Sequence, residues 1–267
     1  MSNAFLVMAA DETSPVIVHV PHASRVIPQA VRTDLLCDAA DLAEELDEAT
    51  DTATDEIAIA ALAHTRSLPT VVINQLSRLV VDPERFPDDS EPSEEYGRGA
   101  VYTRTCSGKP LRREPYPRRT ELLDTYFRPY AAALTDAVTD RLSACGRAII
   151  IDLHSYPEKP SGFEDPNSPR PALCIGADHR HTPDWLIDAT RGSFASLGDI
   201  RENTPYSGCY VPLEHYGHDP RVSSVMIELR RDTYLTDPHT PDHPSVAALG
   251  KSLATLIDTA TDRPADV

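Results

Sequence analysis

The stretch AIIIDLHS at residues 148–155 and the stretch VIVHVPHAS at residues 16–24 decide how this chain folds. Each begins with a short run of branched apolar residues, which is typical of a buried strand. Each then ends at a histidine, His154 or His22, that is followed by a small or hydroxyl residue. Ligands of open α/β sheets collect at the carboxyl ends of the strands. We therefore expect both imidazoles at one edge of a sheet, where a catalytic metal ion could use them.

The rest of the chain alternates between strand and helix patterns. Strands are predicted at residues 15–20, 69–74, 77–82, 147–153, 171–176 and 222–229. Helices are predicted at residues 39–66, 117–145, 183–197 and 243–261. This alternation predicts an α/β fold, a three-layer α/β/α sandwich around a mixed sheet. The length of 267 residues is compatible with one domain, so we expect residues 1–267 to form a single unit.

Two irregular segments interrupt this rhythm. Residues 83–118 are rich in proline, glycine and charged residues, and residues 156–170 directly follow the second histidine segment. A linker has a similar composition, but a polar loop of this length inside a compact domain is often a lid or a binding loop. We expect residues 83–118 to form a lid-like insertion and both segments to wall the site, with plain surface loops as the alternative.

Composition excludes several classes of protein. The formal net charge of −17 argues against binding to nucleic acid or to an anionic membrane surface. No run of about 18 apolar residues is present, and the amino terminus lacks the pattern of a secretory signal. The five cysteines are scattered and odd in number, which does not fit a disulfide framework. We therefore expect a cytoplasmic protein without a nucleic-acid or membrane partner.

A catalytic zinc site takes three protein ligands and leaves one position for water. His22 and His154 supply two, and the third would come from Asp51, Asp55 or Glu56. On a helix, positions 51 and 55 share one face, whereas position 56 points elsewhere. The alternative is a solvated acidic helix face, and spacing alone favours that alternative.

Asp152 lies two residues before His154, so the two side chains point to the same side of a strand. A carboxylate there could accept a proton from the distal nitrogen of His22 and fix its tautomer. A hydrogen bond within a loop or at a helix N-cap is an equally weighted alternative.

Glu228 is a single acidic residue inside the apolar strand pattern of residues 224–231. Burial of a carboxylate is unfavourable unless it is paired or functional, and it raises the pKa toward the range of a general base. The alternative is a buried salt bridge to Arg230 or Arg231.

Asn74, Arg78 and Arg85 belong to a polar cluster around the predicted strands at residues 69–74 and 77–82. The planar guanidinium group grips a carboxylate with two parallel hydrogen bonds, so an arginine set at a strand edge suits an anion clamp. Ion pairs with Asp82 or Glu84 are the alternative. Motifs of serine hydrolases, phosphate loops, dinucleotide folds and HExxH metalloproteases do not occur in the chain.

Taken together, these segments resemble the N-formylglutamate amidohydrolase family. The matching pieces are residues 20–24, 51–56, 74–85, 96–103, 128–130, 151–155, 203–210 and 227–230. They follow the family's order across residues 16–236. No single piece is diagnostic, but the ordered set is a strong match.

The resemblance implies a zinc-dependent amide hydrolase with the phosphorylase/hydrolase-like fold of the zinc carboxypeptidases. It implies one Zn²⁺ per chain, held by His22, His154 and an acidic ligand for which Asp51 is favoured. Glu228 matches the position of a carboxypeptidase-type general base. Arg78 and Asn74 match positions expected to hold the substrate carboxylate. The residues expected to bind the carboxylates of the substrate are Asn74, Arg78, Arg85 and Tyr206.

We therefore expect an amidohydrolase that cleaves an N-acyl amino acid, most simply N-formyl-L-glutamate to formate and glutamate. The metal would lower the pKa of bound water from about 15.7 toward about 7, Glu228 would carry the proton, and Arg78 would help the metal to stabilise the oxyanion. Alternatives are a zinc carboxypeptidase or peptidoglycan amidase, and a non-catalytic ligand-binding protein on the same fold. Iron, cobalt or manganese would also suit two histidines and a carboxylate.

Overall fold

The computed structural model describes residues 4–264, so the predicted unit of residues 1–267 extends beyond it at both ends. A seven-stranded mixed sheet with the order β1-β3-β2-β4-β7-β5-β6 forms its centre. The strands are β1 (Phe5–Met8), β2 (Val16–Val20), β3 (Thr70–Asn74), β4 (Ala148–Tyr156), β5 (Leu173–Gly176), β6 (Ile200–Glu202) and β7 (Val222–Arg230). Strands β3, β2, β4 and β7 are parallel neighbours, so their carboxyl ends meet at one edge.

The outer strands make the sheet mixed. β1 is antiparallel to β3, β5 is antiparallel to β7, and β6 runs parallel to β5. The longer helices are α2 (Ala39–Ala49), α3 (Thr54–Leu62), α5 (Arg128–Cys145), α6 (Asp184–Ser193) and α7 (His243–Asp262). The shorter elements are α1 (Gln29–Arg32), α4 (Arg119–Leu122), a π turn (Leu123–Phe127), the 3₁₀ turns Pro92–Tyr96, Ala195–Leu197 and Arg231–Thr233, and the hairpin of β8 (Leu235–Asp237) and β9 (Thr240–Pro241).

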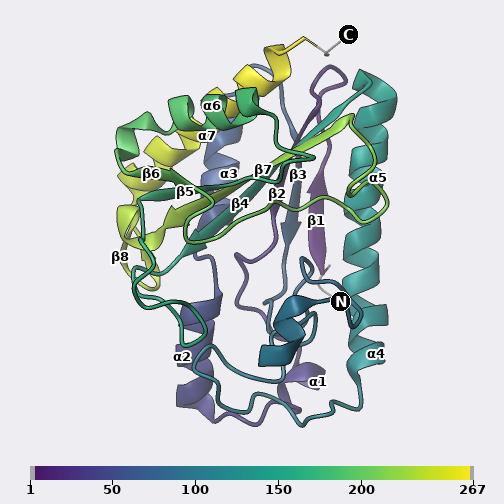
Figure 1. Ribbon diagram of the computed structural model, residues 1–267, viewed down its shortest axis with the longest axis vertical. Helices are drawn as coiled ribbons and strands as arrows, with labels where there is room; N and C mark the ends of the chain where they lie inside the picture. The colour runs from purple at the N-terminus through teal and green to yellow at the C-terminus, as the bar shows by residue number, and fades with distance from the viewer. Residues whose placement is uncertain (1–3, 265–267) are drawn as a thin grey trace.

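Helices cover both faces of the sheet (Figure 1). Side chains alternate between the two faces along a strand, and β2 shows this clearly. Val16, Val18 and Val20 pack in one core with α3, α6 and α7, whereas Ile17 packs in a second core with α5. His19 follows Ile17 to the second face, where its ring lies 5.7 Å from the ring of Tyr130 on α5. The predicted three-layer α/β/α sandwich with a mixed sheet is confirmed.

Two expectations about individual elements are wrong, and two short strands were not predicted. The predicted strand at residues 77–82 is a turn, in which the Ser77 hydroxyl accepts from Leu79 N (3.2 Å) and the Ser77 carbonyl from Val80 N. Such local bonds compete with sheet pairing. The predicted helix at residues 39–66 breaks into α2 and α3. The short edge strands β1 and β6 were not predicted, because they have only four and three residues.

The chain has no element suited to crossing a bilayer among its described residues. Within residues 4–264, no helix combines the length and the apolar composition that a membrane span requires. All five cysteines are free thiols, in line with their scattered spacing in the sequence.

Candidate active site

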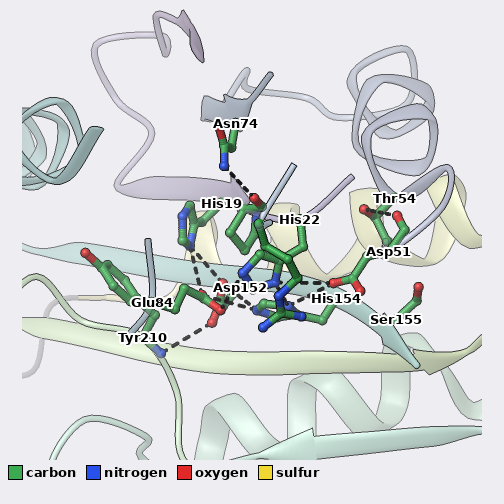
Figure 2. A network of polar contacts seen from close by, with 12 residues as sticks. His19, His22, Asp51, Thr54, Asn74, Glu84, Asp152, His154, Ser155 and Tyr210 are labelled. Carbon is green, nitrogen blue, oxygen red and sulfur yellow. Dashed lines mark hydrogen bonds and ion pairs between the residues drawn. The ribbon is translucent and has the colours of Figure 1, made fainter. Parts of the chain in front are cut away.

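Three buried side chains from distant parts of the sequence converge at the carboxyl edge of the central strands (Figure 2). His22 lies just beyond β2, Asp51 lies between α2 and α3, and His154 lies on β4. The Nδ1 atoms of the two histidines are 3.2 Å apart. Asp51 Oδ2 is 3.1 Å from His154 Nδ1 and 3.6 Å from His22 Nδ1. The sequence predicted a strand that ends at residue 153, just before His154. β4 instead continues to Tyr156, so His154 lies within the strand.

These three donors fit a divalent metal ion. Zinc–ligand bonds of about 2.0–2.1 Å set tetrahedral ligand atoms roughly 3.3 Å apart. The three ligand atoms here are 3.1, 3.2 and 3.6 Å from one another, which is close to that spacing. Two imidazole nitrogens and a carboxylate oxygen point at one place, where a single proton cannot satisfy all three. Two nitrogens with one oxygen form a donor set that binds zinc and neighbouring transition metals.

A break between two helices places Asp51 in this group. α2 ends at Ala49 because Thr50 adopts an extended conformation, and Ala53 adopts a left-handed conformation with φ 63° just before α3 begins at Thr54. The backbone N–H of Asp51 donates to His22 O (3.0 Å), and Arg231 Nη2 lies 3.3 Å from Asp51 Oδ1. The other carboxylate oxygen, Oδ2, therefore faces the two histidines.

This break corrects the expectation that positions 51 and 55 share one helix face. Asp55 and Glu56 lie in the first turn of α3 and line a different cavity. Of the three acidic candidates, only Asp51 reaches the histidines among the described residues. Burial alone would raise the pKa of Asp51, but its hydrogen bonds with His154 and His22 lower it below the usual range.

Asp82 orients His22. Its Oδ1 accepts a hydrogen bond from His22 Nε2 (2.9 Å), which leaves the lone pair of Nδ1 for a metal. Arg78 Nη2 lies 2.6 Å from Asp82 Oδ2, and the Tyr102 hydroxyl donates to the same oxygen. Burial and Arg78 disfavour a charged His22, but Asp82 and Asp51 outweigh them and raise the pKa of His22. The expectation that Asp152 orients His22 is therefore wrong.

Asp152 instead lies beside the other histidine. Its Oδ1 is 3.1 Å from His154 Nε2, as expected for residues two apart on one strand. The same oxygen is 2.8 Å from Nδ1 of His19, which occupies the matching position on β2. Asp152 thus lies beside the candidate metal ligand on its own strand, but its hydrogen bond is with His19.

Glu228 on β7 lies opposite His154 on β4 in the parallel register. The alternative of a buried salt bridge is not found, since Arg231 lies beside Asp51 and Arg230 pairs with Asp232 (2.7 Å). Glu228 Oε2 is buried and has no hydrogen-bond partner among the described residues. Burial raises the pKa of Glu228 to about 8.

The three metal-ligand candidates and Glu228 line one cavity of about 510 Å³. Both irregular segments contribute walls to it. Residues 83–118 supply Tyr96, Arg98 and Tyr102, and residues 156–170 supply Phe163 and Glu164. Such a volume is in the usual range for a small-molecule site.

Three of the four residues expected to bind the substrate line this cavity, namely Arg78, Arg85 and Tyr206. Arg78 is partly engaged by Asp82, which had been the alternative for it. Arg85 Nε is 3.7 Å from Asp82 Oδ2 and forms no hydrogen bond with it. The hydroxyl of Tyr206 donates to Glu164 Oε1 (2.6 Å).

Asn74 lies outside the cavity, so its expected contact with the substrate is not found. Its Nδ2 donates to Pro21 O (3.0 Å), as Figure 2 shows, and its Oδ1 accepts from Leu76 N (3.1 Å). The side chain therefore ties the end of β3 to the segment that precedes His22. These contacts hold the backbone next to His22 and leave the expected role of Asn74 in substrate binding without support.

Sequence reasoning missed the functional placement of Arg231, Glu84 and Arg98. Arg231 had been considered only as a partner for Glu228, and Glu84 only as a partner for an arginine. Arg98 pairs with Glu45 (2.7 Å) and stacks over the Tyr102 ring at the cavity wall. The one signal for these three residues was that they lie in stretches already marked as candidates, namely residues 224–231, 74–85 and 96–103.

Comparisons with known proteins agree with this geometry. The model for the N-formylglutamate amidohydrolase family matches residues 14–235. An N-formylglutamate amidohydrolase from Ralstonia eutropha has the same fold, with a TM-score of 0.78, 21% identity and 97% of each chain covered. A gene product of Agrobacterium tumefaciens follows with a TM-score of 0.69, 21% identity, and 97% of this chain and 95% of that chain covered. No curated protein matches the chain in sequence. Because the family match spans most of the sequence and every residue of the cluster, the chain belongs to the N-formylglutamate amidohydrolase family.

Proposed function

We propose that the protein is a zinc-dependent amidohydrolase that cleaves an N-acyl amino acid, most simply N-formyl-L-glutamate to formate and L-glutamate. Family membership supports a hydrolase that acts on an amide. The observation that carries the metal is the convergence of His22 Nδ1, His154 Nδ1 and Asp51 Oδ2 on one place at the wall of the cavity. These three residues would hold one ion at this site.

When bound there, the ion would supply Lewis acidity, lowering the pKa of a coordinated water from about 15.7 toward about 7 and polarising the scissile carbonyl. Asp82 keeps the His22 imidazole oriented for this role, and Asp152 Oδ1 lies 3.1 Å from His154 Nε2. Arg231 holds the second oxygen of Asp51, so that the carboxylate offers one oxygen to the site. Iron, cobalt or manganese would suit the same donors.

Glu228 is the proton carrier in this proposal. Its carboxylate takes a proton from the attacking water as the new carbon–oxygen bond forms at the carbonyl carbon. It then gives this proton to the amide nitrogen as the carbon–nitrogen bond breaks, so that the amine leaves neutral. An ionised Glu228 is needed for the first step, and a cation at the neighbouring histidine favours that form.

Arg85 and Arg78 would bind the carboxylates of the substrate, together with Tyr206, which also lines the cavity. Arg85 is the better placed of the two arginines, because its Nε has no hydrogen-bonded carboxylate partner among the described residues and its side chain is 38% exposed. Arg78 already binds Asp82 and so links substrate binding to the orientation of His22. It is also placed to stabilise negative charge on the substrate oxygen.

A peptide-cleaving zinc enzyme needs a long open groove. The cavity here is bounded by residues 83–118 and 156–170 and suits a small substrate. A non-catalytic binding protein has no use for an unpaired buried carboxylate, and Glu228 is one. The geometry therefore favours hydrolysis of a small amide over both alternatives.

The test combines metal analysis with a hydrolysis screen over N-formyl, N-acetyl and N-succinyl amino acids. Asp51→Asn should lose zinc from this site and all activity, whereas Asp55→Asn, the neighbouring candidate, should keep both. Retention of zinc and activity in Asp51→Asn, or their loss in Asp55→Asn alone, would overturn the assignment. A wild-type protein loaded with zinc that hydrolyses none of these amides would overturn the proposed reaction.

A further inference from the structure

A second group of potential metal ligands lies on the far side of the His154 ring. Asp152 Oδ1 is 2.8 Å from His19 Nδ1, and Glu84 Oε1 is 3.6 Å from the same nitrogen. His154 Nε2 is 3.1 Å from the Asp152 oxygen and 3.3 Å from the Glu84 oxygen. In Figure 2, His19 and Glu84 lie to one side of His154 and Asp51 lies to the other.

The two carboxylates of this group have no permanent cationic partner. Asp51 lies beside Arg231 and Asp82 beside Arg78. Glu84 and Asp152, in contrast, have only histidines within ion-pair distance among residues 4–264. Two carboxylates at 13% and 2% exposure carry a large desolvation cost, and only histidines lie beside them to offset it. A divalent cation would balance their charge.

An unpartnered nitrogen also points into the group. His154 is 3% exposed, and its Nε2 has no hydrogen-bond partner in the part of the chain that the structure describes. Glu84 Oε1, which faces this nitrogen, is likewise buried without a hydrogen bond. His154 Nε2 and Glu84 Oε1 face each other at 3.3 Å without a hydrogen bond, and Glu84 Oε1 lies 3.6 Å from His19 Nδ1, which are spacings found between ligands of one ion. His19 Nδ1 is hydrogen-bonded to Asp152 Oδ1 (2.8 Å), a contact that a bound ion would replace.

The group has its own route from solvent. A second cavity of about 370 Å³ is lined by Glu84 and Asp152, and it includes Phe127 of the π turn and the segment that carries Tyr210. Glu84 also lines the first cavity, so it belongs to the wall between the two. An ion could therefore enter without passing the proposed reaction centre.

We propose that a second divalent cation, zinc or manganese, binds at His19 Nδ1, Glu84 Oε1 and Asp152 Oδ1. The second oxygen of Asp152 accepts a hydrogen bond from Tyr210 N (3.3 Å), which fixes the ligand as outer partners do at metal sites. The ring of His154 lies between this site and the first one. The site does not depend on the proposed reaction, since none of its three ligands belongs to the first ligand set.

The experiment counts metal ions per chain. Stripped full-length protein is reloaded with excess zinc, desalted and analysed by mass spectrometry of the elements, with manganese in a parallel series. We expect two ions in the wild type, one in His19→Gln, one in Asp51→Asn and none in the double variant. His179→Gln removes an exposed histidine and should keep two.

His19 packs between Tyr130 and Tyr210, so its substitution could perturb folding. Glu84→Gln is therefore the second variant, because the Glu84 side chain is partly exposed and its substitution disturbs packing less. The Glu84→Gln protein should also bind one ion. A wild type that saturates at one ion, retained in both His19→Gln and Glu84→Gln, would overturn the second site. A single ion that is lost in these two variants but kept in Asp51→Asn would instead overturn the first.

Discussion

His154 and Glu228 occupy matching positions on the adjacent parallel strands β4 and β7. Side chains in register on neighbouring strands point to the same face, so the sheet itself holds the proposed base beside the proposed metal ligand. Glu228 gains no hydrogen bond there from any residue of the range 4–264 and is 9% exposed. A carboxylate kept in this position contributes nothing evident to folding, which points to a chemical role.

Glu228→Gln tests that role. Glutamine keeps the size of the side chain but cannot carry a proton between water and the leaving nitrogen. We expect zinc to remain bound and turnover to fall by about a hundredfold or more. Metal content and steady-state turnover of N-formyl-L-glutamate are the measurements. Glu202→Gln, at an exposed position on β6, is the matched control, and an unchanged turnover in Glu228→Gln would remove Glu228 from the mechanism.

The stability of the metal-free protein should depend on pH through the same residue. Burial raises the pKa of Glu228 from 4.5 to about 8, so the folded state binds this proton more tightly than the unfolded state. The resulting stabilisation is complete below about pH 4.5, is lost as the pH rises and is gone above about pH 8. At about 1.4 kcal/mol per pH unit, the loss is on the order of a few kcal/mol.

Glu228→Gln removes this titration. In the presence of a chelator, the melting temperature of the variant should exceed that of the wild type by a margin that grows between pH 5 and pH 8. Thermal unfolding of both proteins at matched pH values measures this margin. A margin that stays constant over this range would mean that Glu228 is already ionised in the metal-free protein.

Asp82 supports His22 and should control metal affinity without binding the ion. In Asp82→Asn the amide oxygen still accepts from His22 Nε2, but the negative charge that strengthens this bond is lost. We expect zinc affinity to fall by about 10–100-fold. Competition with a fluorescent chelator measures it. Asp88→Asn, an exposed substitution in the same segment, serves as the control, and equal affinities in the two variants would contradict the assignment.

The central strands could be predicted from sequence because their apolar runs are continuous and rich in branched residues. β2, β4 and β7 lie in the middle of the sheet and are buried on both faces, and composition reports such burial directly. The edge strands β1 and β6 are short and partly exposed, so they leave no comparable pattern. Position within the sheet thus separates the strands that could be predicted from those that could not.

The acidic ligand could not be settled from sequence for a conformational reason. Glycine commonly marks a left-handed residue, but here Ala53 adopts that conformation, so residues 39–66 read as one uninterrupted helix. Likewise, the partners of Asp82 and Asp152 depend on which loops meet at the sheet edge, since 60 residues separate His22 from Asp82. Residue type identified the candidates, and tertiary contacts decided which of them pair.

Arg85→Lys tests the binding of the substrate carboxylate. Lysine keeps the positive charge but loses the planar fork that makes two parallel bonds, so we expect KM to rise several-fold or more while kcat changes little. Arg113→Lys, at an exposed position, is the control.

Arg78→Lys should raise KM as well, but it should also lower zinc affinity, because Arg78 binds the Asp82 carboxylate that orients His22. Kinetics with N-formyl-L-glutamate and with an N-formyl amino acid that lacks the side-chain carboxylate separate the two arginines. If KM for both substrates is unchanged in Arg85→Lys, the carboxylate is bound elsewhere in the cavity.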